Sequence, residues 1–447
     1  MAASDFADRQ ALEALLERAL SASKADETEA LVLASDASLT RYTHNSAHES
    51  VNERNTQLSV RAVIGKRIGV ASTNRVDEAG VAAVVRRACE CAQLNAEDPE
   101  FPGLPGPQGT VVEPEGCYDE TTAFATPEMR AAAVNDVAKI MRTHNLHGAG
   151  YVSTQADAIA IGNTKGVRRF HRSSDSAINI KAIGSDSSGY AEGYARRFDD
   201  LEVVKLAEHA ARKAVTGKNP RALDPGAYTV ILEPAAFREF LGYLSWIGFG
   251  AQPFEQGSSF MSGKLGQGVV GDNVTIRDDY LHPLGTGLPF DFEGVPRTQV
   301  GLIERGMAKD VVYDSYYAAK LRHANTGHAL PAPNSEGPLP LNIVVEPGTT
   351  TLEQMIKDVT HGVLVTRTWY IRLVDQKQTI ITGMTRDGLF LIENGAIKHG
   401  LKNMRFNDSI VGALGRCQLA SELVRSEDHV LPAARIDDFH FTSGTEF

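Results

Sequence analysis

Residues 227–251 read AYTVILEPAAFREFLGYLSWIGFGA, and this stretch predicts a buried strand that leads directly into a helix. The run Thr229–Leu232, rich in β-branched residues, is typical of a buried strand. Pro234 suits the first position of a helix, and apolar residues then recur at helical spacing as far as Gly248. Many enzymes place catalytic groups at such a junction, yet this helix carries no His, no Cys and no paired carboxylates.

The composition describes a globular protein of two or three domains. The chain has 447 residues, of which 42% are hydrophobic and 23% are charged. Its formal net charge of -11 argues against nucleic acid as the main partner, because phosphate binding needs a basic face. We see no apolar core of a secretory leader and no run near the ~20 apolar residues of a membrane span. We therefore expect a cytoplasmic protein without a membrane partner, which the four cysteines, in no dense framework, also suit.

The N-terminal half predicts two modules that each combine helices with antiparallel strands. The first module covers 1–97 and alternates a helix, strand hairpins and a second helix. The stretch 98–126 is rich in Pro and Gly and is predicted to be a linker or long loop. The second module covers 127–216, and 217–226 is a second linker.

The C-terminal region, 227–447, predicts a mainly antiparallel β domain with few helices. A hairpin signature occurs twice, as LIERGMAK at 302–309 and LIENGAIK at 391–398. Beyond the opening helix, only 351–362 has a clear helical pattern. The fold class is therefore α+β, with two helix-plus-antiparallel-sheet modules followed by a β-rich domain.

Histidines offer metal ligands, but their spacing does not demand a metal. His44 and His48 flank a predicted turn, and residues four apart along a strand are separated by ~13 Å. His282, His323 and His328 are scattered through predicted loops. Their convergence on a metal stays an alternative to ordinary loop and capping roles.

Other catalytic signatures are weak. The stretch 257–266, GSSFMSGKLG, lacks the glycine spacing and the final Ser or Thr of a phosphate-binding loop. No Gly-x-Ser-x-Gly nucleophile elbow occurs. Asp291 and Glu293, in PFDFEGVP, are expected to share one strand face and are a candidate acid/base pair. The alternative for these carboxylates is a solvated strand or a salt bridge to Arg297.

Five segments of the C-terminal half together resemble the TldD/TldE family, in which TldE is also called PmbA. They are PFDFEGVP, TGHALPAPN, GVLVTRTWY, ITGMTRDGLFLIENG and PAARIDDFHFTS. The stretch LTRYTHNSAHESVNERNTQLSVRAVIGKRIGVAST is similar to the family's N-terminal hairpins, so the resemblance spans nearly the whole chain. It implies a cytoplasmic peptidase of two related subunits that matures ribosomally made peptides and degrades small or unfolded proteins.

The resemblance accounts for the helix that follows Leu232. In TldD-type subunits this helix carries zinc on His-Glu-x-x-x-His with a distant Cys, and TldE-type subunits lack the motif. With the register anchored by the strand before the helix and by GSSFMSGKLGQ after it, the motif positions become Gly242, Tyr243 and Ile247. These residues supply neither zinc ligands nor a carboxylate base, and Cys417 lacks the family's Cys-Gly-Lys pattern. The resemblance therefore implies degenerate catalytic positions, no metal or cofactor in this chain, and zinc in a TldD-type partner.

Three functions remain open at this point. The chain could be a zinc-free, TldE-like subunit that pairs with a TldD-type subunit or with a second copy of itself. It could be an independent hydrolase that uses Asp291, Glu293 and His328. It could also be a peptide-binding scaffold without catalytic activity. An extended peptide is the expected ligand of the subunit and of the scaffold.

The segment 362–374, GVLVTRTWYIRLV, is the candidate peptide groove. An extended peptide can add to an exposed sheet edge through backbone hydrogen bonds, with little demand on its sequence. We expect Arg367, Trp369 and Arg372 to face a shared cavity and to grip an acidic or C-terminal carboxylate, with Tyr370 beside them. The alternative is that Trp369 and Tyr370 pack in the domain core.

Overall fold

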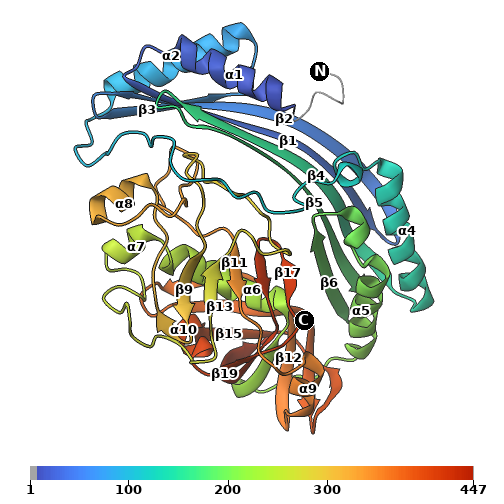
Figure 1. The fold of residues 1–447 in the computed structure, drawn as a ribbon. Helices are drawn as coiled ribbons and strands as arrows, with labels where there is room; N and C mark the ends of the chain where they lie inside the picture. The colour runs from blue at the N-terminus through green and yellow to red at the C-terminus, as the bar shows by residue number, and fades with distance from the viewer. Residues whose placement is uncertain (1–7, 446–447) are drawn as a thin grey trace.

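The N-terminal half forms one long six-stranded antiparallel sheet that arches over the rest of the molecule (Figure 1). The computed structural model of the protein describes residues 8–445, so the outermost limits of the predicted modules, residues 1 and 447, lie outside the described residues. Across the sheet the strands follow the order β3 (Arg67–Thr73), β2 (Ser46–Ile64), β1 (Glu27–Thr43), β4 (His147–Asn163), β5 (Arg168–Ile183) and β6 (Ser188–Ala195).

The strands of both predicted modules belong to this one sheet. β1 pairs with β2 through a tight turn at His44 and Asn45, and both residues have positive φ, as such hairpin turns require. On its other side β1 pairs with β4, in a register that runs from Glu29 opposite Asn163 to Tyr42 opposite Gly150. Sequence-local hairpin signals cannot reveal this second pairing, because the two strands are separated by two other strands, three helices and a long loop.

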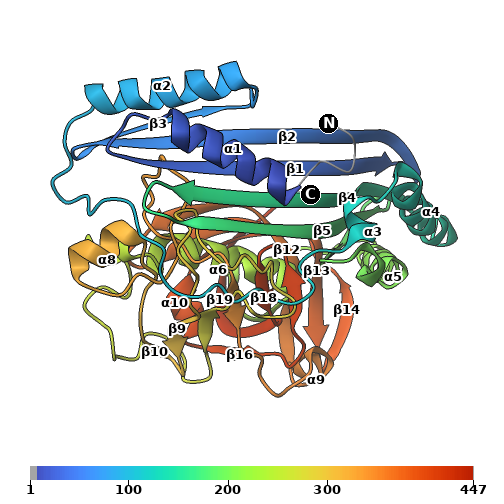
Figure 2. The ribbon, with the colours of Figure 1, turned by 45° about the horizontal axis from the view of Figure 1, so that its top comes forward.

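Four helices cover the convex face of the long sheet, two at each end (Figures 1 and 2). They are α1 (Arg9–Ala22) and α2 (Glu78–Leu94) at one end, and α4 (Pro127–Thr143) and α5 (Val203–Thr216) at the other. Alternate residues Ala30, Val32 and Ala34 of β1 pack with the apolar stripes of α1 and α2. The α4 helix begins at Pro127, the predicted first residue of the second module, and Thr126 is its N-cap.

The stretch 98–126 passes between the sheet and the C-terminal half as an extended chain with one short helix, α3 (Glu120–Ala123) (Figure 1). It is anchored rather than loose, because Phe101 and Leu104 are buried and the Leu104 N–H donates to Glu27. The stretch 98–126 therefore contributes to the contact between the two halves.

A 3₁₀ turn, η2 (Phe198–Asp200), precedes α5.

The C-terminal half contains two sheets. In the first, five strands close into a ring in the order β12 (His361–Asp375), β7 (Gly226–Leu232), β19 (Ala434–Gly444), β15 (Met404–Ser409) and β13 (Ile380–Glu393). The short strands β14 (Ala396–Gly400) and β16 (Cys417–Leu419) pair at its rim. The second sheet has the order β10 (Met307–Ala308), β9 (Val300–Glu304), β8 (Ile276–Asp278), β11 (Ile343–Val345), β18 (His429–Leu431) and β17 (Val424–Ser426).

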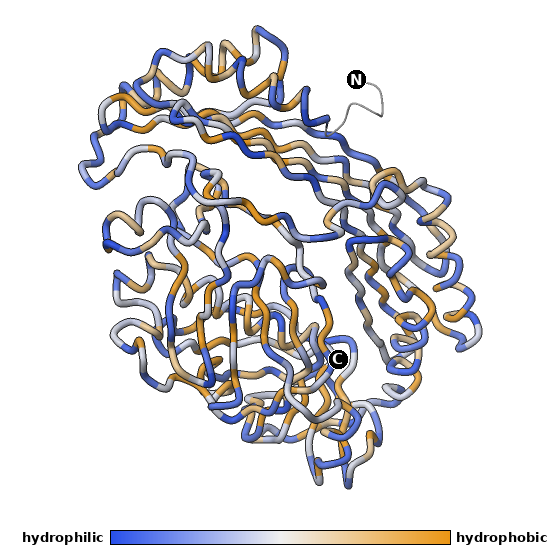
Figure 3. The backbone as a smooth tube through the Cα atoms, in the orientation of Figure 1, coloured by the Kyte–Doolittle hydropathy of each residue, from blue (hydrophilic) through white to orange (hydrophobic). Residues whose placement is uncertain are grey.

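Both sheets pack around α6 (Pro234–Gly248), the helix of the opening stretch. Its side chains Phe237, Phe240 and Leu244 are each at most 1% exposed and belong to the main core. The remaining helices are α7 (Ala251–Glu255), α8 (Ser315–Leu321), α9 (Leu352–Lys357) and α10 (Ile410–Leu414). Hydrophobic stretches run through the interior of this half, and hydrophilic ones mark its loops (Figure 3).

The fold class is α+β, as the sequence predicts, with antiparallel pairing dominant. Two parallel pairings interrupt the antiparallel pattern, between β7 and β12 and between β11 and β18. Within residues 8–445, no helix combines the length and the apolar character that crossing a membrane needs.

Candidate functional site

Helix α6 carries the three positions that the resemblance aligns with a zinc site. Apart from the adjoining residues and backbone of α6, a Cβ atom at Gly242 would meet nothing within 4 Å, so this glycine borders open space. Ile247 is buried, and the Tyr243 hydroxyl donates a 2.9 Å hydrogen bond to the Ile371 carbonyl. In the part of the chain that the structure describes, no three His, Cys, Asp or Glu side chains are grouped to hold a metal ion. At these positions α6 thus presents one hydroxyl, already bonded.

Tyr243 connects α6 to an open strand edge. β12 pairs with β7 only over residues 362–365, and beyond that point its only partner strand among the described residues is β13. We call residues 366–375 the β12 edge. Trp246 lies next to Tyr243, with ring centroids 6.3 Å apart, and its indole N–H donates to Glu336. One side of the β12 edge therefore faces a helix rich in aromatic residues.

Trp369 and Tyr370 do not pack in the core, which corrects that alternative. Trp369 is 48% exposed and Tyr370 is 61% exposed. The pairing of β12 with β13 shifts register between Trp369 and Arg372, and Tyr370 has a φ of 57° within that bulge. A bulge turns consecutive side chains out of the normal alternation, so both aromatic rings reach solvent.

The arginines of the predicted groove lie at two separate places. Arg367 pairs with Asp387 and stacks on the ring of Tyr190 at 4.3 Å, on the side of the sheet that faces β6. Arg372 instead stacks on Tyr370 at 4.4 Å and donates to the Ile371 carbonyl. We therefore correct the expectation of one shared cavity.

The sequence reasoning missed three residues that gather around Arg367 and Trp369. Arg386 lies directly opposite Arg367 across the β12–β13 pair, and its guanidinium is 4.7 Å from the ring centroid of Trp369. Asp387 follows it, and Lys181 reaches Asp387 from β5. Register and domain packing bring these residues together, and no local pattern marks them.

Asp291 and Glu293 occupy a turn rather than a strand, and both are buried. The Asp291 carboxylate accepts hydrogen bonds from two backbone N–H groups of its own turn and from the N–H of Ala329. Burial and the charge of Glu293 raise the pKa of Asp291 to about 7. Glu293 pairs with Arg61 of β2 at 3.1 Å, which corrects the expected salt bridge to Arg297. The two carboxylates thus stabilise a turn and a contact between the two halves.

Asp314, near Glu293, provides a pH-dependent test of this acidic region. It caps α8 by accepting from the N–H of Tyr317, and burial, together with Glu293, raises its pKa to about 6. Above pH 6 Asp314 is charged in both states, and because its charged form is disfavoured in the folded state, the free energy of unfolding is lowered there. This destabilisation fades as the pH falls from 6 and is absent below the unfolded pKa near 3.8.

We expect Asp314→Asn to raise the free energy of unfolding by about 2 kcal/mol at pH 8, because Asn also caps helices but carries no charge. At pH 4 the variant and the parent should unfold alike. Urea unfolding at both pH values measures the difference. A variant that is less stable than the parent at pH 8 would show that the fold needs the charged carboxylate.

The scattered histidines do not converge. His328 is fully buried, and its imidazole contacts Asp278 at 3.1 Å and the Thr326 hydroxyl at 2.9 Å. His323 stacks on the ring of Tyr313 at 4.0 Å. The His282 ring accepts a hydrogen bond from the N–H of Leu284, so each of the three histidines has its own local partners.

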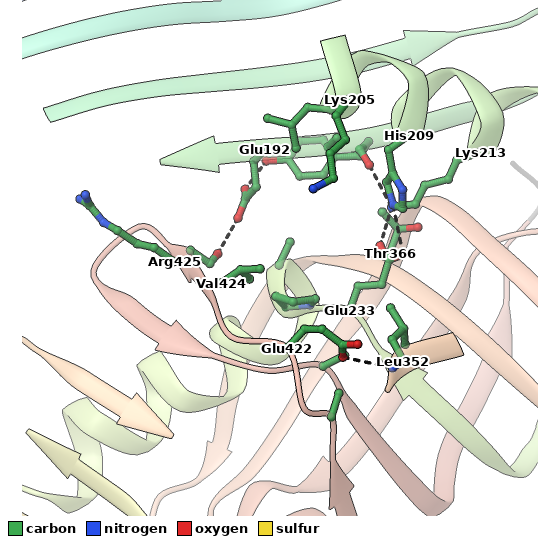
Figure 4. Close-up of a pocket in the computed structure, with 18 residues that line it drawn as sticks. Glu192, Lys205, His209, Lys213, Glu233, Leu352, Thr366, Glu422, Val424 and Arg425 are labelled. Carbon is green, nitrogen blue, oxygen red and sulfur yellow. Dashed lines mark hydrogen bonds and ion pairs between the residues drawn. The ribbon is translucent and has the colours of Figure 1, made fainter. Parts of the chain in front are cut away.

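A pocket of about 440 Å³ lies between α5 and the start of α6 (Figure 4). Lys213 of α5 pairs with Glu233, the N-cap residue of α6, and His209 lies 3.5 Å from the same carboxylate. Burial opposes the charge of Glu233, but Lys213 and His209 outweigh it, so the pKa of Glu233 lies below its ordinary value. The pair of Lys213 and Glu233 in this pocket connects α5 to the start of α6.

Family models match the chain in sequence order. The PmbA/TldA metallopeptidase domain 1 matches residues 38–92, the central domain matches 122–218, and the C-terminal domain matches 225–443.

Similar proteins carry metalloprotease names. Metalloprotease PmbA of Escherichia coli O157:H7 is 26% identical over 352 residues, which cover 74% of this chain and 73% of that protein. The Metalloprotease PmbA homolog of Haemophilus influenzae is 25% identical over 361 residues, which cover 76% and 75%. The crystal structure of TldE from Thermococcus kodakarensis superposes with a TM-score of 0.86 at 21% identity, and covers 97% of this chain and all of that one. At this identity the structural likeness establishes a shared fold.

Proposed function

Because the chain belongs to the PmbA/TldD metallopeptidase family, we propose that it is a zinc-free, TldE-like subunit that completes a TldD-type peptidase. The observation that carries the proposal is the state of α6. The helix keeps its buried packing and its position after β7, while Gly242, Tyr243 and Ile247 supply no metal ligand. A zinc peptidase needs three protein ligands and an open position for water, so the hydrolytic step falls to the partner.

The contribution of this subunit is to hold an extended peptide. A peptidase must present its substrate with the scissile bond positioned, and strand addition does this through the peptide backbone alone. The β12 edge supports this role, because it is unpaired on one side and carries the exposed rings of Trp369 and Tyr370. Small or unfolded proteins are the matching substrates, since only an extended chain can pair with an edge.

The independent-hydrolase alternative has less support. Asp291 is held by backbone amides, Glu293 by Arg61, and His328 by Asp278 and a neighbouring hydroxyl. A peptide-binding scaffold would use the same β12 edge and differs only in lacking a catalytic partner. The assay of the mixed subunits below separates it from the first proposal.

The subunit is proposed to act in the cytoplasm as a dimer with a TldD-type chain or with a second copy of itself. Its four cysteines are free thiols, and Cys117 and Cys417 are buried, which suits a reducing compartment. Light scattering should give about twice the 48.2 kDa chain mass for either dimer.

Cleavage by the mixed subunits tests the proposed function. We expect the isolated chain, purified without a metal-affinity tag and dialysed, to retain far less than one zinc per chain and to leave an unfolded test peptide intact. Addition of a TldD-type chain should produce cleavage that a chelator abolishes and zinc restores. One zinc retained per isolated chain, or no cleavage by the mixture, would contradict the proposal.

A further inference from the structure

Three cations surround one buried carboxylate where β12 and β13 meet the N-terminal sheet. Lys181 lies 2.8 Å and Arg367 lies 2.7 Å from the Asp387 carboxylate, and Arg386 approaches to 3.8 Å. The Ser188 hydroxyl also donates to Asp387 at 2.8 Å. Burial opposes the charge of Asp387, but Arg367 and Lys181 outweigh it and hold its pKa below the ordinary value. One carboxylate thus faces three cations, which leaves an excess of two positive charges.

The arrangement of the two arginines is unfavourable by itself. Arg367 and Arg386 are directly opposite each other in the antiparallel register, and like charges at such positions repel. Trp369 lies beside both, with its ring centroid 5.4 Å from the Arg367 guanidinium and 4.7 Å from that of Arg386. Contact with the ring offsets part of the repulsion. A bound anion would offset the rest.

A cavity of about 220 Å³ opens at this place. Its lining includes Lys181, Arg386 and Trp369, and the polar side chains of Ser188 and Thr385. A second cavity of about 330 Å³ shares Lys181 and Ser188 with the first and extends it along the domain junction. The site therefore combines excess positive charge, hydroxyl groups and the exposed face of an aromatic ring.

We propose that this cavity binds the carboxylate at the C-terminal end of an extended peptide, and we call it the carboxylate site. The proposal rests on the proposed function, in which the peptide lies along the β12 edge, because Arg367 and Trp369 belong to that edge. A guanidinium matches the planar fork of a carboxylate, and Lys181 adds a point charge. The half-exposed ring of Trp369 offers an apolar surface for the last side chain of the peptide. The preferred ligands are peptides with a free C-terminus.

Binding to the chain alone tests the carboxylate site without any need for cleavage. The probes are an N-acetylated alanine hexapeptide ending in leucine as the free acid, the same peptide as its C-terminal amide, and an amide ending in glutamate. Calorimetry should show that the free acid binds at least about tenfold more tightly than the leucine amide, with the difference shrinking at high salt. Equal affinity for these two probes would overturn the proposal. Glutamate-amide binding as tight as the free acid would overturn the assignment to a C-terminus.

A matched pair of variants locates the site. Arg386→Gln should lower the affinity for the free acid to that for the amide, and Lys181→Gln should do so in part. Arg405→Gln removes the same charge from an arginine that contacts Met384 at the border of the cavity but does not line the cavity itself, and this variant should keep the full preference. In a Trp246→Phe background Trp369 is the only tryptophan, and binding of the free acid should change its fluorescence. The assignment would be overturned if Arg386→Gln still preferred the free acid over the amide, or if Arg405→Gln lost this preference to the same extent as Arg386→Gln.

The two proposals fail in different ways. Carboxylate preference without cleavage by the mixed subunits would leave the carboxylate site standing and remove the peptidase role. If the mixed subunits cleave the free acid and the amide equally, and the chain binds both peptides equally, the subunit role stands and the carboxylate site does not.

Discussion

Replacing Arg61 by methionine is expected to lower the free energy of unfolding by about 4 kcal/mol, because it leaves two buried carboxylates without a counter-ion. The Arg61 guanidinium is 2.7 Å from Glu29 of β1 and 3.1 Å from Glu293 of the C-terminal half. All three side chains are nearly buried, and burial raises the pKa of Glu29 despite its pairing with Arg61. The substitution should therefore loosen the contact between the two halves as well as the sheet.

Thermal unfolding and limited proteolysis of the linker 98–126 measure this effect. Arg54→Met is the matched control, since Arg54 lies on the same strand and pairs with Asp36 at a more exposed place. Exposed pairs contribute about 1 kcal/mol or less, so this control should melt close to the parent. Adding Glu29→Gln and Glu293→Gln to Arg61→Met should restore part of the loss. A methionine variant that melts with the parent would contradict the role assigned to Arg61.

The second large effect concerns activity. Trp369→Ala is expected to reduce peptide cleavage by the reconstituted pair at least about tenfold, because an exposed tryptophan beside two arginines is a typical binding hot spot. Its melting temperature should change little, since half of the side chain is already in solvent. Arg367→Ala should reduce cleavage as well, with a moderate loss of stability because Arg367 pairs with the buried Asp387.

The control for Trp369→Ala is Phe124→Ala. Phe124 has a similar exposed fraction, 52%, and lies at the end of α3, away from the β12 edge. The Phe124 variant should cleave at the parental rate. Parental cleavage by Trp369→Ala would place the peptide elsewhere, and unfolding of that variant would contradict its observed exposure.

Local elements could be predicted from the sequence because their signals are local. Pro234 is the first residue of α6, and Pro127, where the second module is predicted to begin, is the first residue of α4. The turn after β1 lies at His44 and Asn45, close to the turn that the sequence predicts between His44 and His48. Each signal acts within one turn of the chain, through backbone dihedrals or a capping hydrogen bond. The α+β class followed from the order of such elements.

Only part of the candidate site could be predicted, because sequence signals are local and some features of the site depend on strand pairing. The residue types at Gly242, Tyr243 and Ile247 can be read from the sequence alone, whereas their alignment with a zinc motif is what the family resemblance implies. Whether Trp369 is exposed depends on a bulge in the pairing of β12 with β13, and the sequence left its exposure and burial equally open.

Only the tertiary structure decided which charges meet. Arg61 and Glu293 are 232 residues apart, and Lys181 reaches Asp387 from the other half of the chain. Composition and spacing cannot identify such pairs, because strand register and domain packing set them. The sequence by itself thus determined which residues this helix lacks, whereas the packing of two sheets determined where the surplus positive charge collects, since Coulomb interactions depend on distance in space rather than along the chain.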